Sequence, residues 1–151
     1  MFEMNVVSNT PLDSIKAVEE VAEMFLTQIG YLPRNPDGRA GGNGLRDSVP
    51  YRLFMDHFMR NMGKAWSVDE LAVLLGTTRP TVYRHINKLK SLDILESLDV
   101  EIDGQYKKGY RIRYGDLSKA WNFTEANVNM AMENYKRTVQ HLQELARSRE
   151  D

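Results

Sequence analysis

The sequence predicts a mainly helical fold that carries a small β-hairpin. In several segments an apolar residue recurs every three or four positions, two short helical segments flank a glycine turn, and one stretch alternates between apolar and charged residues. At 151 residues and 42% hydrophobic composition, the chain suits one domain with terminal extensions. We expect an N-terminal helix and glycine-rich hinge loop in 1–47, a helix-turn-helix with its hairpin in 48–117, and a C-terminal dimerisation helix in 118–151.

The composition excludes several classes of protein. A chain without cysteine forms no disulfide, thiolate metal site or thiol nucleophile. No apolar run is long enough to cross a bilayer, and the N-terminus lacks a basic segment followed by an apolar one, so we expect a cytoplasmic protein without a membrane partner. Because the net charge is only −1, any binding of nucleic acid must come from a local patch.

The first helix is expected over residues 11–30. Its apolar stripe comprises Ile15, Val18, Ala22, Phe25 and Ile29, and Gly30 is suited to end it. From Leu32 to Asp47 the chain holds four of its ten glycines and two of its five prolines, which predicts a loop or hinge.

A second helix is expected to begin at Ser48 and to end at Gly63. Ser48 is a candidate N-cap, and Pro50 suits the first turn of a helix. The apolar face of this helix is Tyr51, Phe54, Met55, Phe58 and Met62.

Two short helices follow with clear start and stop signals. Ser67 and Glu70 form a capping-box signature ahead of Leu71, Leu74 and Leu75, and Gly76 ends this helix. Thr78 is expected to cap the next helix, in which Val82, Ile86 and Leu89 face the core. Two helices joined by such a turn form a helix-turn-helix.

The hairpin is expected from two alternating strands. Leu98, Val100 and Ile102 alternate with acidic residues, and Tyr110, Ile112 and Tyr114 alternate with arginines. A two-residue turn at Asp103 and Gly104 would pair Ile102 with Gln105 and bring the two apolar sets out of phase. Loops of three or seven residues would keep the sets on one face, so we expect a looser tip that contains Lys107, Lys108 and Gly109.

The last helix is expected to open at Thr124 and Glu125. Its apolar residues follow a heptad-like seam, at Val128, Met132, Tyr135, Val139, Leu142 and Ala146. Together with the N-terminal stripe this seam exceeds what the small core can cover, which predicts a homodimer. The expected dimerisation residues are Ile15, Val18, Ala22, Phe25, Val128, Met132, Tyr135, Val139 and Leu142.

The segment SVDELAVLLGTTRPTVYRHINKLKSLDILE resembles the winged helix-turn-helix superfamily, in particular the dimeric regulators of the MarR and ArsR types. Asp93 departs from the pattern, since these families commonly have glycine before the first wing strand. Tyr31 to Arg34 with Gly38 and Arg39 resemble the choline and glycine-betaine repressor branch. The resemblance implies a mainly α fold with a β-hairpin wing. It also implies a dimeric, DNA-binding transcriptional regulator that responds to a small-molecule effector and needs no cofactor.

The outward face of the second helix of the motif is the candidate DNA reader. Arg79 and Arg84 can fork onto guanine, while Thr81 and Tyr83 suit phosphate oxygens. Residues 79–113 hold eight basic and five acidic residues, a local charge of +3. The expected DNA-binding residues are Thr78, Arg79, Thr81, Tyr83, Arg84, Asn87 and Lys88, with Lys107, Lys108, Arg111 and Arg113 of the wing on the backbone or minor groove. A dimer would read a pseudo-palindromic operator with half-sites about 34 Å apart.

Other interpretations stay open beside this one. Winged helices also serve as protein-interaction modules, in which a basic helix is only a solvated face. His141 and Glu144 lie one helical turn apart as metal ligands can, but Val128 to Met130 offer no further ligand, so no metal is expected. Trp66 and Trp121 suit either core packing or an aromatic cage for a quaternary ammonium effector. No catalytic spacing stands out, so the sequence does not predict an enzyme.

Overall fold

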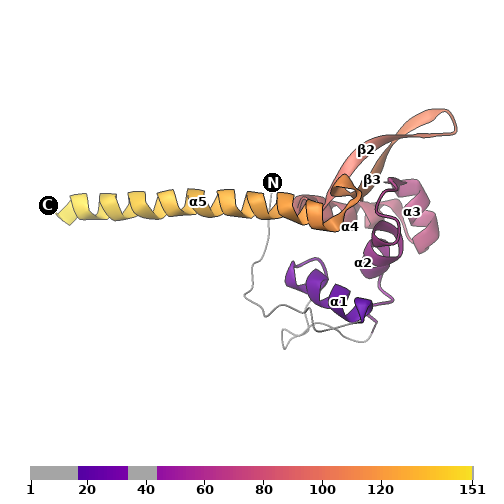
Figure 1. Ribbon diagram of the computed structural model, residues 1–151, viewed down its shortest axis with the longest axis horizontal. Coiled ribbons are helices and arrows are strands. Elements are labelled where there is room, and N and C mark those ends of the chain that lie inside the picture. The colour runs from indigo at the N-terminus through magenta and orange to yellow at the C-terminus, as the bar shows by residue number, and fades with distance from the viewer. Residues whose placement is uncertain (1–16, 34–43, 151) are drawn as a thin grey trace.

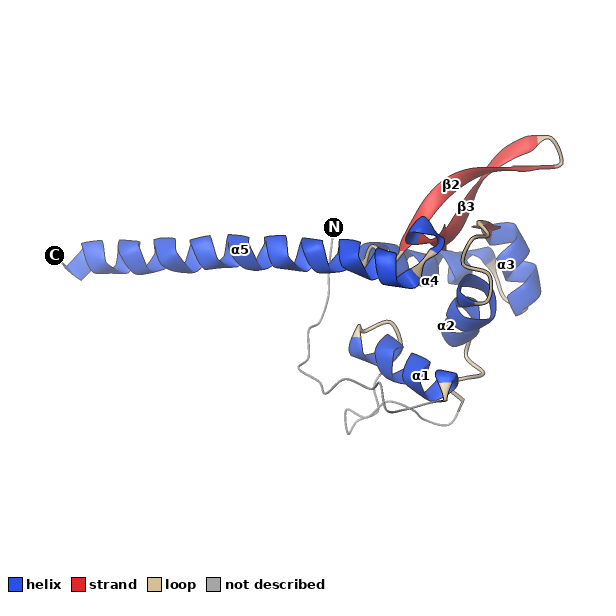
Figure 2. Cartoon of the chain, in the orientation of Figure 1, coloured by secondary structure: helices blue, strands red, loops and turns tan. Residues whose placement is uncertain are grey.

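The computed structural model describes residues 17–33 and 44–150 of the chain. The elements follow in the order α1 (Val18–Gln28), α2 (Val49–Arg52), η1 (Leu53–Met59), β1 (Trp66–Ser67), α3 (Val68–Leu75), α4 (Arg79–Ser91), β2 (Leu95–Ile102), β3 (Gln105–Ile112), η2 (Arg113–Gly115) and α5 (Leu117–Glu150). The first helices and the base of the sheet gather into a head, from which the β2–β3 hairpin and the long α5 project (Figure 1). The expected fold class, mainly helical with a small β wing after a helix-turn-helix, is confirmed (Figure 2).

The first helix is shorter than expected at its N-terminal end. Ala17 is extended, with φ −76° and ψ 115°, so α1 begins at Val18 and the expected start at Pro11 is wrong. Its end agrees with the sequence, because Gly30 takes a φ of 85° and the next amide, of Tyr31, bonds the Leu26 carbonyl at 3.0 Å. Ile15 and most of the expected hinge loop lie outside the described residues.

The second helix is not a regular α-helix. After one turn of α2, the chain widens into the π-helix η1, which was not expected. Leu53, the first residue of η1 and absent from the expected apolar face, is buried in the core with Phe54 and Phe58. Ser48 stands at the N-cap position and Pro50 lies in the first turn, as expected.

The helix-turn-helix forms where the sequence indicated, but Leu74, expected on the apolar face of α3, is 53% exposed. The Ser67 hydroxyl accepts the amide of Glu70 at 3.2 Å, and the Thr78 hydroxyl accepts the amide of Thr81 at 3.4 Å, which caps α3 and α4. Gly76 ends α3 in the left-handed conformation, with φ 65°. Val82 and Ile86 of α4 are fully buried.

The hairpin turn differs from expectation. Ile102 pairs with Gln105 across a two-residue turn in which Asp103 and Gly104 have φ of 52° and 77°, so the looser tip at Lys107 to Gly109 is wrong. The two apolar sets do not need to share a face, because the hairpin carries apolar residues on both of its faces. Leu95, Tyr110 and Ile112 share the face toward the core, whereas Leu98, Val100 and Ile102 lie on the other face. The alternation of apolar and charged residues in this exposed hairpin therefore does not mean that the apolar residues of both strands lie on one buried face.

The opposite face has room for these residues because Gly109 carries no side chain. A Cβ at Gly109 would lie 3.0 Å from the Cβ of Ala65 and 3.0 Å from Cγ1 of Val100. Trp66 and Ser67 form a third strand, β1, which pairs Trp66 with Tyr110 in the sheet order β1-β3-β2. Arg113 and Tyr114, expected in a strand, lie instead in η2.

The last helix begins seven residues earlier than expected. Asp116 accepts the amide of Lys119 at 3.0 Å at the start of α5, and Thr124 is an interior residue rather than a cap. The Thr124 hydroxyl instead donates to the Leu92 carbonyl at 2.8 Å. This bond attaches α5 to the end of α4.

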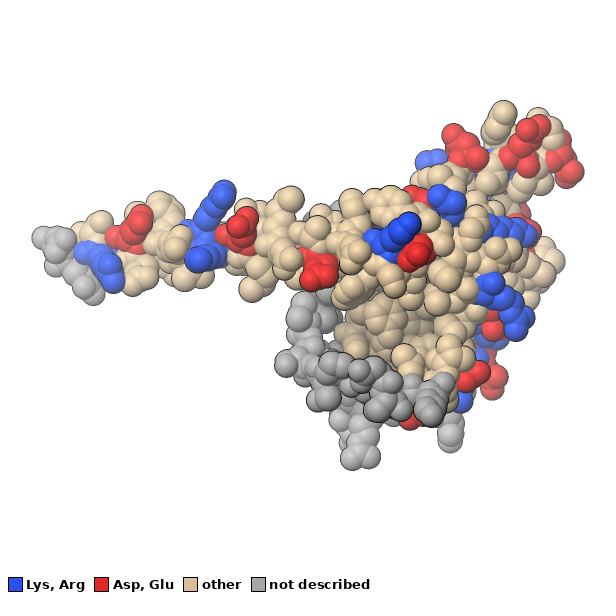
Figure 3. All heavy atoms as spheres, in the orientation of Figure 1, with Lys and Arg blue, Asp and Glu red and all other residues tan. Residues whose placement is uncertain are grey.

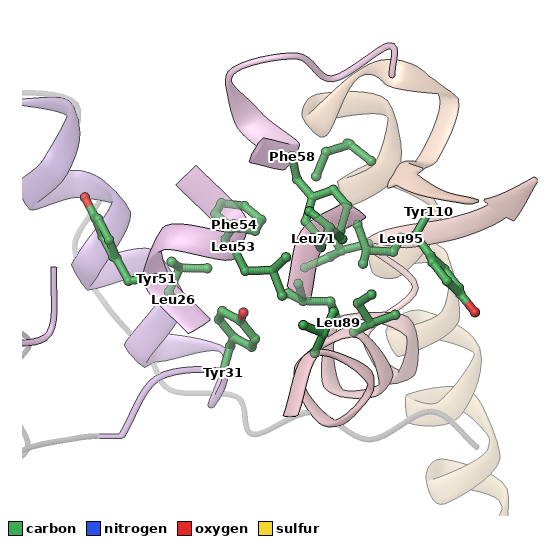
Figure 4. Packing of buried hydrophobic residues seen from close by; sticks show 14 of the residues in the cluster. Leu26, Tyr31, Tyr51, Leu53, Phe54, Phe58, Leu71, Leu89, Leu95 and Tyr110 are labelled. Carbon is green, nitrogen blue, oxygen red and sulfur yellow. The ribbon is translucent and has the colours of Figure 1, made fainter. Parts of the chain in front are cut away.

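A single core joins the helices of the head. Leu26 and Tyr31 from the N-terminal segment belong to the same cluster as Phe54 and Leu89, and the cluster continues to Leu95 and Tyr110 at the hairpin base (Figure 4). Phe25 of α1 also meets Trp121 of α5 edge to face, with ring centroids 5.7 Å apart. The N-terminal helix therefore packs on the helix-turn-helix rather than apart from it. Among the described residues, none of the helices is both long and apolar enough to cross a membrane.

Candidate nucleic-acid interface

The solvent face of α4 carries four cationic side chains and no acidic one. Burial of Val82, Ile86 and Leu89 turns the opposite arc of the helix outward. On that arc the expected residues Arg79, Tyr83, Arg84, Asn87 and Lys88 are exposed, and Lys90 adds a fourth positive charge. Such a face offers guanidinium and amide groups that match base edges and ammonium groups that match phosphates.

The N-terminal end of α4 is shaped by its cap. Thr78 is exposed, and its hydroxyl accepts the Thr81 amide and lies 3.0 Å from the Thr81 hydroxyl. Both threonines are thus engaged with each other in the free chain. Their hydroxyls lie at the positive end of the helix dipole, where a phosphate is stabilised.

A groove separates α4 from the wing. It has a volume of about 310 Å³, and its lining residues come from β1, α3, α4 and β3: Ser67, Val68, Asp69, Arg79, Tyr83, Lys107 and Lys108. The three cations of this lining exceed the single acid, so the groove favours an anion. Its position joins the expected residues of the helix and the wing into one surface.

Asp69 was missed in the sequence analysis. Its carboxylate forms ion pairs with Arg79 Nε at 2.8 Å and with Lys107 Nζ at 3.3 Å. One acidic residue of α3 therefore connects α4 to the wing. Its only sequence signal is an acidic residue in the first turn of α3, which is common for a helix start. Only the folded chain brings Arg79 and Lys107 to the same carboxylate.

The four wing cations fall into two pairs. Lys107 and Lys108 lie on the exposed part of β3. Arg111 is half-buried and donates to Glu96 at 2.8 Å, and Arg113 donates to the Asp93 carbonyl at 3.0 Å and stacks 4.3 Å from the Phe123 ring. The arginines therefore hold the base of the hairpin, while the lysines extend along it.

The acids of the wing lie on its outer strand. β2 carries Asp99 and Glu101, and β3, with the lysines, lies between β2 and β1. Asp99 is directly opposite Lys108 in the register. On the face of the molecule shown in Figure 3, acidic side chains gather toward the hairpin tip, and Lys and Arg lie lower on the head.

His85 lies on the buried side of α4 as a neutral imidazole. Its side chain meets the Tyr31 ring edge to face at 6.3 Å, and Nδ1 has no hydrogen-bond partner in the described part of the chain. Burial, followed by the positive charges of Arg84 and Lys88, lowers the pKa of His85 to about 4. His85 therefore contributes packing rather than charge at neutral pH.

The expected dimerisation residues lie in different surroundings. Ala22 is buried in the chain's own core and Phe25 is partly covered by Trp121, whereas Val18 is 58% exposed. In α5, Val128 is half-exposed, and Met132, Tyr135, Val139 and Leu142 have exposed fractions between 61% and 67%. From Met132 to Leu142 the apolar seam of α5 is thus left exposed by the described part of the chain.

The remaining candidates of the sequence analysis do not converge on one site. Trp66 contacts His57 and the Lys64 ammonium, whereas Trp121 contacts Phe25, so the two tryptophans belong to separate clusters. In the described residues, His141 and Glu144 are exposed on α5 and are not part of any cluster of three residues of metal-binding type.

Comparison with known proteins agrees with this geometry. A family described as an HTH domain matches residues 53–111. These residues form a helix-turn-helix domain. The match runs from η1 to β3 and so includes α3, the turn, α4 and most of the wing.

The chain also has a distant likeness to a solved structure. A solved structure titled "Possible transcriptional regulator from Methanosarcina mazei Go1" shares 20% identity, with a TM-score of 0.42, over 62% of this chain and 77% of that one. No curated protein matches the chain.

Proposed function

We propose that this protein is a sequence-specific, DNA-binding transcriptional regulator that acts as a homodimer. The observation that carries the proposal is the solvent face of α4, which combines four cations, an amide and hydroxyl groups and contains no acid. A helix of this kind suits the major groove of duplex DNA, where arginine reads guanine and asparagine reads adenine. The helix-turn-helix match supports the same assignment.

Within this proposal the helix and the wing have separate roles. Arg84 is exposed on α4 and is the candidate base reader, with Arg79 at the start of the same helix as a second candidate, whereas Lys107 and Lys108 extend toward the backbone or minor groove. A flexible ammonium suits a phosphate, and a rigid guanidinium fork suits a base edge. Arg111 and Arg113 are proposed to support the wing and to meet phosphates only at its base.

The proposed dimer uses α5. Its residues from Met132 to Leu142 leave an apolar stripe in solvent, and large exposed stripes of this kind mark interaction surfaces. Val18 of α1, also proposed for the dimer, is exposed as well. A homodimer would present two α4 helices to successive major grooves, about 34 Å apart, on a pseudo-palindromic operator.

The finer parts of the assignment rest on the resemblance of the sequence. We propose the MarR and ArsR types as its relatives, with the choline and glycine-betaine repressor branch as the nearest candidate, and a small-molecule effector as the signal. In the same scheme, 1–47 supplies a helix and hinge, 48–117 binds DNA, 118–151 dimerises, and the regulator works in the cytoplasm.

The alternative is a winged-helix module that docks on another protein, and duplex titration separates the two. A DNA-binding protein loses affinity steeply as salt rises, because each neutralised phosphate releases counterions. We expect a log-log salt slope of several units and selection of a two-fold-related site from a random duplex pool. Absence of duplex binding at about 50 mM salt would favour protein docking.

A further inference from the structure

We propose that the seam of α5 pairs with a second copy of this chain in antiparallel orientation, with the two-fold axis crossing the pair at the level of Arg137 along the helix. The inference rests on the dimer proposed above and specifies its geometry. The segment 125–149, called the arm, is an exposed helix whose apolar stripe repeats at spacings of four and three residues. Those spacings assign heptad positions, and the assignment lets the two orientations be compared layer by layer.

The ends of the arm carry the decisive charges. Three residues before Val128 and three residues after Ala146, the same spacing reaches Glu125 and Arg149, both of which are exposed. In an antiparallel pair centred on Arg137, Glu125 lies opposite Arg149 of the partner subunit, and the reverse contact forms at the other end. A parallel pair would instead place Glu125 against the same glutamate and Arg149 against the same arginine, which is repulsive in both layers.

The apolar layers favour the same orientation by size. Antiparallel pairing sets Val128 against Ala146 of the partner subunit, Met132 against the partner's Leu142, and Tyr135 against the partner's Val139. A larger side chain then meets a smaller one in the Val128 and Tyr135 layers, and Met132 meets a leucine of similar volume, as close packing requires. Parallel pairing would stack the two Tyr135 rings in one layer and leave two alanines facing each other in another.

The two flanks of the seam differ in polarity. One flank consists of Ala131, Thr138 and Leu145, and the other of Asn129, Lys136 and Gln143. Antiparallel helices bring like flank against like flank, so the more apolar set is covered by itself and the polar set stays in water. The two Lys136 side chains approach each other near the axis, but each has Glu133 three residues earlier on its own helix.

This orientation also separates the DNA-binding heads. Thr124, which attaches α5 to the end of α4, lies 26 helical steps from its equivalent in the antiparallel pair, or about 39 Å along the axis. That separation is comparable to the roughly 34 Å between successive major grooves. Parallel helices would place the two attachment points about 10 Å apart.

Because the chain contains no cysteine, single engineered thiols report the orientation directly. In full-length chains, Thr138→Cys should cross-link efficiently through a short thiol-specific linker, since the two equivalents lie near the axis. Met132→Cys, the matched control, should not cross-link, because its equivalents lie about 15 Å apart along the helix. Circular dichroism checks that both variants retain helicity.

The outcomes separate this proposal from the dimer itself. Cross-linking of Met132→Cys, alone or with Thr138→Cys, would overturn the antiparallel orientation and leave a dimer. A monomer by sedimentation, without cross-links, would overturn the dimer together with its orientation, while duplex binding by that monomer would leave the DNA assignment standing. A dimer in which neither thiol cross-links would overturn the use of this seam.

A charge exchange tests the end layers independently. Glu125→Arg should weaken the dimer at least tenfold, and adding Arg149→Glu should restore it, because the exchanged pair again has opposite signs across the axis. In a parallel dimer the single change would replace one like-charge layer by another and leave the dissociation constant unchanged. Failure of the second change to rescue the first would also contradict the antiparallel arrangement.

Discussion

The side-chain amide of Asn127 donates a 2.7 Å hydrogen bond to the carboxylate of Asp93, which links α5 to the exit of α4. Beside it, the Thr124 hydroxyl donates to the Leu92 carbonyl, and Arg113 donates to the Asp93 carbonyl at 3.0 Å. Asp93 itself has a φ of 60°, a conformation that glycine adopts without strain. An aspartate here keeps the turn and adds a side chain that binds α5, so α4 and α5 are positioned together.

Substitution of Asp93 should separate backbone strain from side-chain bonding. Asp93→Gly loses the bond to Asn127 but relieves the left-handed backbone, so its free energy of unfolding should fall by no more than about 1 kcal/mol. Asp93→Ala loses the same bond and keeps the strain, which should cost about 1 kcal/mol more than glycine does. Urea denaturation measures both. Equal stabilities for the two variants would show that the φ of Asp93 carries no strain.

Arg84 and Lys108 should differ in how they affect DNA selectivity. Arg84→Ala is expected to cost about 1–3 kcal/mol on the preferred duplex and little on a scrambled one, because a lost base contact removes sequence information. Lys108→Ala should weaken both duplexes alike and make the salt slope shallower by about one unit, because a lost phosphate contact releases fewer counterions. Titrations of both variants against both duplexes at several salt concentrations provide the measurement.

The two variants control for each other, since each removes one exposed cation. Equal loss on both duplexes from Arg84→Ala, with altered selectivity from Lys108→Ala, would reverse the roles of reader and holder. If neither variant changed binding, the protein-docking interpretation would gain support.

Removal of the Asp69 charge should strengthen binding to every duplex. Asp69 neutralises Arg79 and Lys107 in the free chain, so Asp69→Asn frees both cations for phosphate. We expect several-fold higher affinity for preferred and scrambled duplexes at low salt, with a steeper salt slope. Asp99→Asn, also on an exposed acid near a wing lysine, serves as the comparison. Weaker binding of Asp69→Asn would instead show that the ion pairs hold Arg79 and Lys107 in the productive geometry.

Stability should fall between about pH 6.5 and pH 4 because of His85. Burial lowers the pKa of His85 to about 4 from an ordinary 6.5, so in this window the unfolded chain takes up a proton that the native chain does not. None of this stability is lost above pH 6.5. The loss in free energy of unfolding grows as the pH falls and reaches at most about 3 kcal/mol at pH 4. His85→Phe cannot titrate at this position, so urea denaturation of this variant should show a shallower decline over the same range. Parallel pH profiles for the two proteins would contradict this account.

The sequence alone determined the helix boundaries and helix faces that depend on residues close together in the chain. Ser67, Thr78 and Gly76 mark helix boundaries by groups that act within three or four residues, and the structure places the helix-turn-helix at those positions. The same is true of the inward face of α4, because helical periodicity alone turns Val82, Ile86 and Leu89 to one side. The cationic, acid-free opposite face could be named before any coordinates for the same reason.

Only the tertiary structure decided features that depend on partners distant in the chain. The hairpin register followed from packing of Leu95 and Ile112 on the core and of Val100 over Gly109, which strand alternation does not encode. The Asp69 ion pairs join α3, α4 and β3, and the Asn127 bond to Asp93 spans 34 residues. A charge or amide selects such a partner only after the hydrophobic core has brought the elements together. Helix caps could therefore be predicted from the sequence, and these long-range bonds could not.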